Sequence, residues 1–248
     1  MLESRIARRA LISLLACPVG FVTMTAAGEA TVPPRPDFNG IWDRVVLKPR
    51  PAHFDPNFLN VDQQQPPLKP AYMALWKERL VASSKGDLSY DTSVTQCLPK
   101  GMPRIMMAPY GLEIVQSERQ INMFNEASQE TLRIIMDGRG PEDGDYEPSY
   151  VGFTRGRWEG SALKTTTIGL RADTLFDGSG IPHSQSLTVE QTFRLLDENT
   201  LENIVVSKDP KALEKDWVVR MTYRRAPKDR YVDEAVCLEK LGDSATKR

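Results

Sequence analysis

The chain has 248 residues, 40% of them hydrophobic, and its 32 basic and 33 acidic side chains leave a net charge of −1. This length and apolar content indicate one large domain with a real core, and exclude a disordered or fibrous chain. The balanced charge argues against nucleic acid as a partner. No apolar run reaches the ~18 residues that a transmembrane helix needs.

Residues 1–28 are predicted to be a signal peptide. Arg5, Arg8 and Arg9 form a positive region, Ala10–Val22 is a short apolar stretch, and small residues follow. The protein is therefore expected to be periplasmic or secreted. Two variants of this prediction stay open, namely a twin-arginine signal at Arg8 and Arg9, and a lipid anchor on Cys17.

Residues 29–70 are rich in proline and are predicted to form an extended arm or linker, because proline is excluded from central strands. Within this arm, Asp37–Trp42 is predicted to turn into a first strand from about residue 37. Ala71–Ala82 is the one predicted helix, and it carries Tyr72, Leu75, Trp76 and Leu80 at helical spacing.

Beyond Pro103, short runs alternate between apolar and polar residues, which is typical of antiparallel strands buried on one face. Such strands, with one helix, predict an all-β domain over residues 71–248. About eight to ten strands joined by hairpins favour an antiparallel up-and-down barrel over a sandwich, because closure removes exposed edges. The predicted strands are Tyr110–Gln116, Ile121–Asn125, Leu132–Met136, Val151–Trp158, Ala162–Ile168, Leu187–Leu196, Leu201–Val206, Trp217–Arg224 and Ala235–Glu239.

Two cysteines, Cys97 and Cys237, remain after removal of the signal peptide. In an oxidising compartment such a pair predicts a disulfide. It would close a loop of ~140 residues and tie the last strand to the start of the sheet. Two buried free thiols are the alternative.

Five segments occur in an ordered series along the chain: Asp37–Trp42, Cys97–Arg104, Asp137–Arg139, Gly156–Gly160 and Pro182–Ser184. From Asp37 to about Cys237, this series resembles a family of exported bacterial proteins with a lipocalin-like barrel. A weaker similarity is to cofactor-independent decarboxylases of lignin-derived phenylcoumaran acids. The resemblance implies a barrel around a small-molecule cavity and chemistry without a cofactor.

Metal and nucleotide sites are not expected. His53 and His183 are the only histidines, and no cysteine pair has the spacing of a zinc site. The sequence also lacks a glycine-rich phosphate loop and a Gly-x-Ser-x-Gly nucleophile turn. We therefore predict no metal and no cofactor.

His183, Asp137 and Arg139 are the predicted catalytic residues. His183 lies in a loop before a strong strand and can move protons near neutral pH; the alternative is a loop histidine that binds a backbone carbonyl. Asp137 and Arg139 could form an acid and an anion clamp at the barrel rim. The alternative is an Asp-Gly turn with Arg139 solvated or paired to Asp137.

Three arginines and three tyrosines are the predicted ligand-binding residues. The arginines would hold a carboxylate in the cavity, or else form internal salt bridges. The tyrosines would orient a phenol, or else pack at the rim. These residues are Arg104, Arg155, Arg157, Tyr110, Tyr146 and Tyr150.

The resulting functional hypothesis is a lyase, of decarboxylase or isomerase type, acting on a small aromatic, lignin-derived acid. The arginines would hold the carboxylate while His183 moves the proton. The first alternative is a non-catalytic carrier of a small hydrophobic ligand. The second is an envelope protein whose barrel is filled by its own side chains.

Overall fold

The computed structural model describes residues 35–46, 65–126, 128, 130–141, 146–232 and 236–237. The chain divides into two compact units, Met1–Val32 and Pro33–Arg248, and all that follows concerns the second. The predicted signal peptide, most of the proline-rich arm, and most of the predicted strand Ala235–Glu239 lie outside the described residues.

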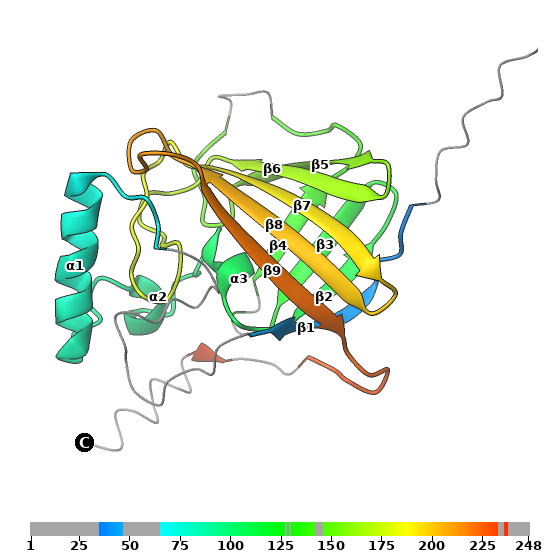
Figure 1. Cartoon of the computed structure of the whole chain (residues 1–248), viewed down its shortest axis with the longest axis horizontal. Coiled ribbons are helices and arrows are strands. Elements are labelled where there is room, and N and C mark those ends of the chain that lie inside the picture. Colours follow the sequence, from blue (N-terminus) through cyan, green and yellow to red (C-terminus); the bar gives the residue numbers. More distant parts are fainter. Residues whose placement is uncertain are drawn as a thin grey trace, which may run out of the picture. The chain divides into compact units, whose positions relative to one another are not determined.

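Nine strands form a closed barrel in chain order (Figure 1). β1 pairs with β2 on one side and with β9 on the other, which closes the ring. The predicted all-β barrel is confirmed, with nine strands. They are β1 Gly40–Val45, β2 Leu112–Gln116, β3 Gln120–Asn125, β4 Thr131–Ile135, β5 Phe153–Glu159, β6 Ala162–Ile168, β7 Thr188–Asp197, β8 Thr200–Lys208 and β9 Trp217–Arg225.

One junction departs from the antiparallel pattern. β4 and β5 run parallel, and their register covers only Ile134 with Thr154 and Ile135 with Arg155. A parallel pair needs a connection that returns the chain to the end of the sheet where β4 began. The structure describes residues 136–141 and 146–152 of this connection. This connection packs on β5, because a Cβ on Gly140 would lie 2.1 Å from the ring of Phe153. We call the β4–β5 junction the seam.

The strands form because their residues alternate between a buried and a half-exposed face. In β7, Val189, Gln191 and Phe193 are buried, whereas Glu190 and Thr192 between them are partly exposed. The predicted one-sided burial is therefore confirmed. The buried faces of the strands line the barrel interior.

A short helix, α3 (Arg104–Met107), is buried over its whole length against the barrel. Asn125 Nδ2 donates a hydrogen bond of 2.7 Å to the carbonyl of Ile105, and the Tyr223 hydroxyl donates one of 3.2 Å to that of Met106. Neither α3 nor the equally short α2 (Thr92–Thr95) was predicted from the sequence, because four residues are too few to show a helical period.

Helix α1 (Pro70–Ser84) confirms the predicted helix and begins with proline in its first turn, where no backbone donor is lost. Trp76, its one buried residue, donates to the carbonyl of Ser179 at 3.2 Å, so the helix packs on the loop between β6 and β7. Leu75 is 37% exposed, so the predicted apolar stripe is wrong at that residue. None of the described helices is long and apolar enough to cross a membrane.

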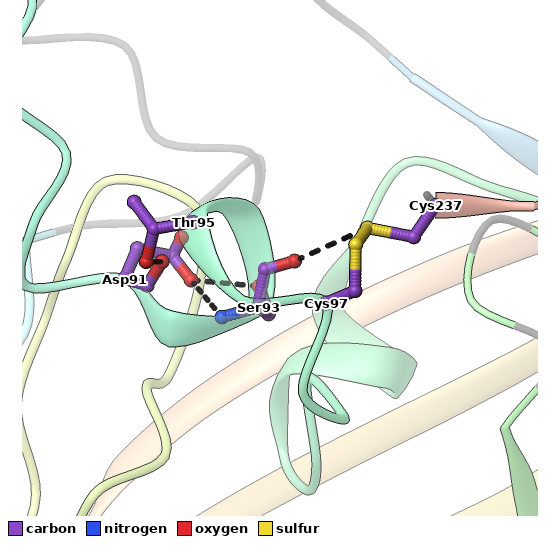
Figure 2. The surroundings of a disulfide bond; sticks show 5 residues. All are labelled: Asp91, Ser93, Thr95, Cys97 and Cys237. Carbon is purple, nitrogen blue, oxygen red and sulfur yellow. Dashed lines mark hydrogen bonds between the residues drawn. A yellow bond between two sulfur atoms is a disulfide. The ribbon is translucent and has the colours of Figure 1, made fainter. Parts of the chain in front are cut away.

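The predicted disulfide between Cys97 and Cys237 is present, with an S–S distance of 2.08 Å and a Cα–Cα distance of 5.7 Å. It joins the segment after α2 to the segment beyond β9, and Cys237 Sγ lies 3.8 Å from the carbonyl oxygen of Ser93 (Figure 2). The expected role in closing the barrel is not the one found. Pairing of β1 with β9 closes the ring, and the disulfide lies outside the sheet.

Candidate functional site

His183 is buried in the loop between β6 and β7, and both of its ring nitrogens are engaged. Nδ1 lies 2.9 Å from the carbonyl oxygen of Ser184, and Nε2 lies 2.8 Å from the Thr174 hydroxyl. A carbonyl can only accept, so Nδ1 carries the proton, and Nε2 competes with the carbonyl of Arg171, 2.9 Å from the Thr174 hydroxyl, for the single proton of that hydroxyl. Burial lowers the pKa of His183, against the opposing effect of the bond to Ser184. These contacts match the alternative of a loop histidine bound to a backbone carbonyl.

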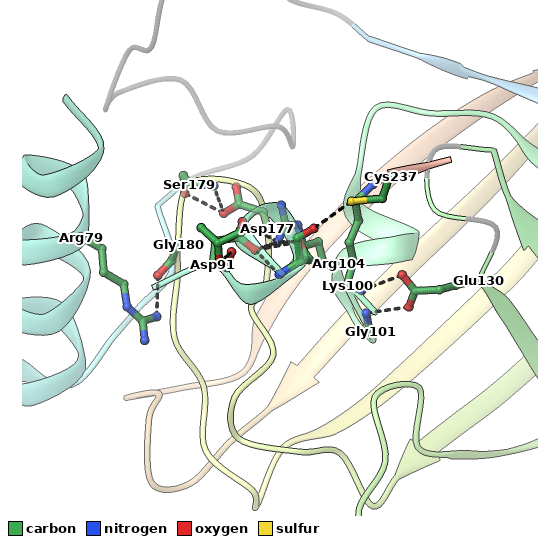
Figure 3. A network of polar contacts seen from close by, with 12 residues as sticks. Arg79, Asp91, Lys100, Gly101, Arg104, Glu130, Asp177, Ser179, Gly180 and Cys237 are labelled. Atoms are coloured by element: carbon green, nitrogen blue, oxygen red, sulfur yellow. Dashed lines mark hydrogen bonds and ion pairs between the residues drawn. The ribbon is translucent and has the colours of Figure 1, made fainter. Parts of the chain in front are cut away.

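Arg104 is buried and paired within the protein. Its Nη1 lies 2.8 Å from Asp91 Oδ2 and 3.0 Å from the hydroxyl of Ser93 (Figure 3). Burial alone would raise the pKa of Asp91, but the charge and hydrogen bonds of Arg104 outweigh it and hold that pKa below its usual value. The guanidinium thus fixes α2 and α3 together.

Asp137, Arg139 and Arg157 lie at the surface. Asp137 forms an ion pair with Arg119 at 2.7 Å and a longer one with Arg139 at 3.6 Å. Arg157 pairs with Glu159 at 2.6 Å. The structure therefore places Asp137 and Arg139 in the exposed turn that the sequence offered as the alternative reading.

Arg155 is half-buried on the outward face of β5, since the buried Thr154 next to it points inward. Its guanidinium lies 5.0 Å from the centre of the Phe153 ring and hydrogen-bonds the carbonyl of Pro141. This contact holds the returning connection against β5. The alternation of β5 puts Arg157 on the same outward face.

Each of the three predicted tyrosines packs against a different neighbour. Tyr110 is beneath the ammonium of Lys100, Tyr150 is beneath the guanidinium of Arg171, and the ring of Tyr146 covers Gly169. The structure does not gather the nine predicted catalytic and binding residues into one site. Of them, Arg139 and Tyr150 alone line the hollow described below.

A group of buried polar side chains in the barrel interior was missed by the sequence analysis. Thr165 on β6 is directly opposite Gln191 on β7, and Gln191 is opposite Val205 on β8. Asn203 and Ser207 lie two residues to either side of Val205 on the same face. All four polar side chains are at most 2% exposed. We call Thr165, Gln191, Asn203 and Ser207 the interior cluster.

The interior cluster is only partly satisfied. Asn203 Nδ2 donates to Gln191 Oε1 at 3.0 Å. Within the described part of the chain, Thr165 Oγ1, Gln191 Nε2, Asn203 Oδ1 and Ser207 Oγ have no hydrogen-bond partner. A buried polar group left without a partner costs roughly 1–3 kcal/mol. Buried water or a bound molecule inside the barrel could satisfy these four atoms.

The sequence does hold a signal for the interior cluster. Gln191 interrupts the apolar face formed by Val189 and Phe193, and Asn203 and Ser207 interrupt that of β8. Polar residues at inward positions are unfavourable unless they have a partner. A search for breaks in the apolar alternation would have found them.

A hollow of about 680 Å³ follows the outer face of β4. We call it the outer groove. Thr131, Arg133 and Ile135 form its floor, because they alternate with the buried Leu132 and Ile134. Its full lining is Pro99, Gln120, Glu130, Thr131, Leu132, Arg133, Ile135, Arg139, Ser149, Tyr150, Val151, Gly152, Phe153 and Thr154.

No cluster of three or more His, Cys, Asp or Glu side chains suited to a metal ion occurs among the residues that the structure describes. No model of a known protein family matches the chain, and no match to a curated protein was found. The resemblance to exported barrel proteins therefore stays a prediction.

Proposed function

We propose that the barrel is a carrier for a small, uncharged, largely apolar molecule that bears a hydroxyl or carbonyl group. The observation that carries this proposal is the interior cluster, with its four buried polar atoms that the described residues leave unpartnered. A small aromatic alcohol or phenol is the simplest ligand of this kind.

The chemistry of the cluster selects a neutral group. Gln191 Nε2 can only donate, Asn203 Oδ1 can only accept, and the hydroxyls of Thr165 and Ser207 can do either. A ligand hydroxyl can accept from Gln191 and donate to Asn203 at the same time. None of the four side chains carries a charge, so nothing in the cluster would neutralise a buried carboxylate.

The opposite wall of the barrel suits the apolar part of such a ligand. In the ring of nine strands, β2 and β3 lie across from β7. Their inward residues include Leu112, Ile114, Ile121 and Met123, all buried. A ligand that turns its polar edge to the interior cluster would therefore rest on aliphatic and thioether groups, which adapt well to flat apolar molecules.

These contacts favour binding over the lyase hypothesis. A decarboxylase of the expected type would combine a carboxylate clamp and a proton carrier in one cavity. Arg155 and Arg157 are on the outward face of β5, and His183 uses both ring nitrogens within its own loop.

Export is part of the proposal. The disulfide between Cys97 and Cys237 fits an oxidising compartment. A carrier with the predicted signal peptide would act in the periplasm or outside the cell.

The test uses N-phenyl-1-naphthylamine, an uncharged dye that fluoresces in apolar sites, with naphthalene and 2-naphthol as competitors. These two differ by one hydroxyl. We expect 2-naphthol to displace the dye more effectively. In Thr165→Val the ratio of 2-naphthol affinity to naphthalene affinity should fall about threefold to tenfold, as expected for one lost hydrogen bond. Thr166→Val, the same change on the outer face of the same strand, should leave it intact.

Mass spectrometry after incubation with a panel of phenols and aromatic acids separates binding from turnover. A carrier returns every compound unchanged, whereas loss of carbon dioxide from an acid would support the lyase instead. Failure of the dye to bind, or an equal preference in Thr165→Val and the wild type, would mean that the interior cluster holds water alone.

A further inference from the structure

We propose that the outer groove is a second binding site, which takes a small, flat organic anion such as an aromatic carboxylate. It is separate from the interior site, because its floor is the outward face of β4. Three features support this site: an arginine with no ion pair among the described residues, aromatic residues in the lining, and walls that are fixed in place.

The groove exists because the seam is short. β4 joins β5 only through Ile134 and Ile135. Ahead of Phe153, the chain turns instead toward the end of β6, where Ser149 N donates to the carbonyl of Gly169 at 2.9 Å. The two backbones therefore diverge, and the outward side chains of β4 form the floor between them.

Arg133 supplies the charge. Its side chain is exposed on the groove floor, and it makes no hydrogen bond or ion pair within the described ranges. Arg139, at the end of the groove, already binds Gln120 Oε1 at 2.7 Å and lies 3.6 Å from Asp137. Arg133 is thus the guanidinium available for a ligand, and guanidinium binds carboxylate in a two-pronged geometry.

Glu130, the one acidic residue in the described lining, does not form an ion pair with Arg133. Both carboxylate oxygens of Glu130 accept backbone hydrogen bonds, from Lys100 at 2.6 Å and from Gly101 at 2.7 Å (Figure 3). Among the described residues of the lining, two arginines and one glutamate sum to a charge of +1. An anion is favoured there, and a cation is not.

The rest of the lining fits a flat apolar body. Phe153 and Tyr150 are part of the lining, although their rings also contact Arg155 and Arg171, and Pro99, Ile135 and Val151 add aliphatic surface. Aromatic rings gain about 0.5–1.5 kcal/mol from stacked or edge-on contacts beyond the area they bury. A hollow of 680 Å³ is within the size range of small-molecule sites.

The wall that carries Pro99 is fixed in place. Cys97 is tied to Cys237 by the disulfide, and Lys100 and Gly101 are tied to Glu130. The backbone N–H of Met102 donates to the carbonyl of Tyr150 at 2.8 Å, which joins this wall to the opposite one. A ligand therefore meets a preformed groove and need not order it, which favours affinity.

The proposal is tested by calorimetric titration with 2-naphthoate, an anion with a flat aromatic body. We expect binding by the wild type that weakens as salt is raised, and about tenfold or greater weakening in Arg133→Gln, the loss expected for a hydrogen-bonded charge. Arg157→Gln removes the same charge from the outer face of β5, away from the groove, and should bind as the wild type does. The neutral analogue 2-naphthamide should bind far more weakly.

Three results would each overturn the proposal: equal affinity in Arg133→Gln and the wild type, equal affinity for 2-naphthamide, or no heat of binding at all. Displacement of N-phenyl-1-naphthylamine by 2-naphthoate would place the anion inside the barrel and also count against it. Arg133→Gln should still bind the dye and 2-naphthol normally. This control shows that the variant is folded and keeps the fate of this proposal separate from that of the interior carrier.

Discussion

Surroundings, more than residue type, decide what a single side chain can do in this protein. His183 has the most versatile side chain in the sequence for proton transfer, yet Thr174 and Ser184 occupy both its nitrogens. Arg133 is an ordinary surface residue by its position in the sequence. It becomes the best candidate for binding an anion because none of the described residues forms an ion pair with it.

His183 should make stability fall as the solution becomes mildly acidic. Burial lowers its pKa in the folded protein, so below the ordinary value of about 6.5 the unfolded chain binds a proton that the folded one refuses. Stability is thus full above that value and declines as pH falls below it. We expect His183→Asn, which keeps a donor for Ser184, to lose less stability between pH 7 and pH 5 than the wild type. Urea unfolding at both pH values measures this, and an equal or larger loss would contradict it.

The hydroxyl of Thr165 should cost stability in the empty protein. It is buried and unpartnered among the described residues, whereas valine has the same shape without the polar atom. Thr165→Val is expected to unfold at a higher urea concentration, with a gain in unfolding free energy of about 0.5–1 kcal/mol. Saturation with 2-naphthol should remove that gain, because the wild type binds it more tightly. A clear loss of stability without ligand would show that the hydroxyl is already satisfied.

At the scale of elements, sequence pattern predicts long strands with regular alternation, but it does not predict helices of a single turn. β6, β7 and β9 alternate over seven to ten residues, and their predicted bounds are within one residue of the structure. The α2 and α3 helices have four residues each and show no period. The parallel direction of β5 relative to β4 is a long-range property that no local sequence pattern predicts.

Gly156 should be needed for the packing of the seam. It faces the barrel interior on β5, and a Cβ there would lie 2.5 Å from Ile134 Cγ2 and 2.6 Å from Met136 Sδ. We expect Gly156→Ala to destabilise the protein by about 1–3 kcal/mol through overpacking. Ile134→Ala removes the clashing methyl group, so the double variant should lose less than the sum of the two single losses. Strict additivity in urea unfolding would show that the two residues do not meet.

At the scale of the whole molecule, the disulfide spans most of the barrel in sequence. It joins residues 140 positions apart, and by the chain-entropy model such a loop restricts the unfolded chain by up to about 5 kcal/mol. The Cys97→Ala, Cys237→Ala double variant should therefore lose about 2–5 kcal/mol of unfolding free energy. Wild type treated with reductant should match it, and the variant should not respond to reductant. A stability unchanged by both treatments would exclude this role.

The sites were harder to predict than the fold, because each joins residues that are far apart in the sequence. The outer groove combines Pro99, Arg133 and Phe153, and the interior cluster joins three strands. Alternation along a strand tells which face a residue takes, but not which residues lie beside it. Gln191 could have been predicted from the sequence as a polar residue at an inward position. That Arg133 lies exposed on the floor of a groove could be seen only in the structure.

A closed barrel should open most readily between the two strands that share the fewest residue pairs. Two residue pairs hold β4 to β5, and the register of β7 with β8 runs from Thr188 to Asp197. We expect small molecules to pass between bulk water and the barrel interior through this junction. An anion bound in the outer groove would contact both sides of this junction and hold it closed. We therefore expect 2-naphthoate to slow the release of N-phenyl-1-naphthylamine from the barrel.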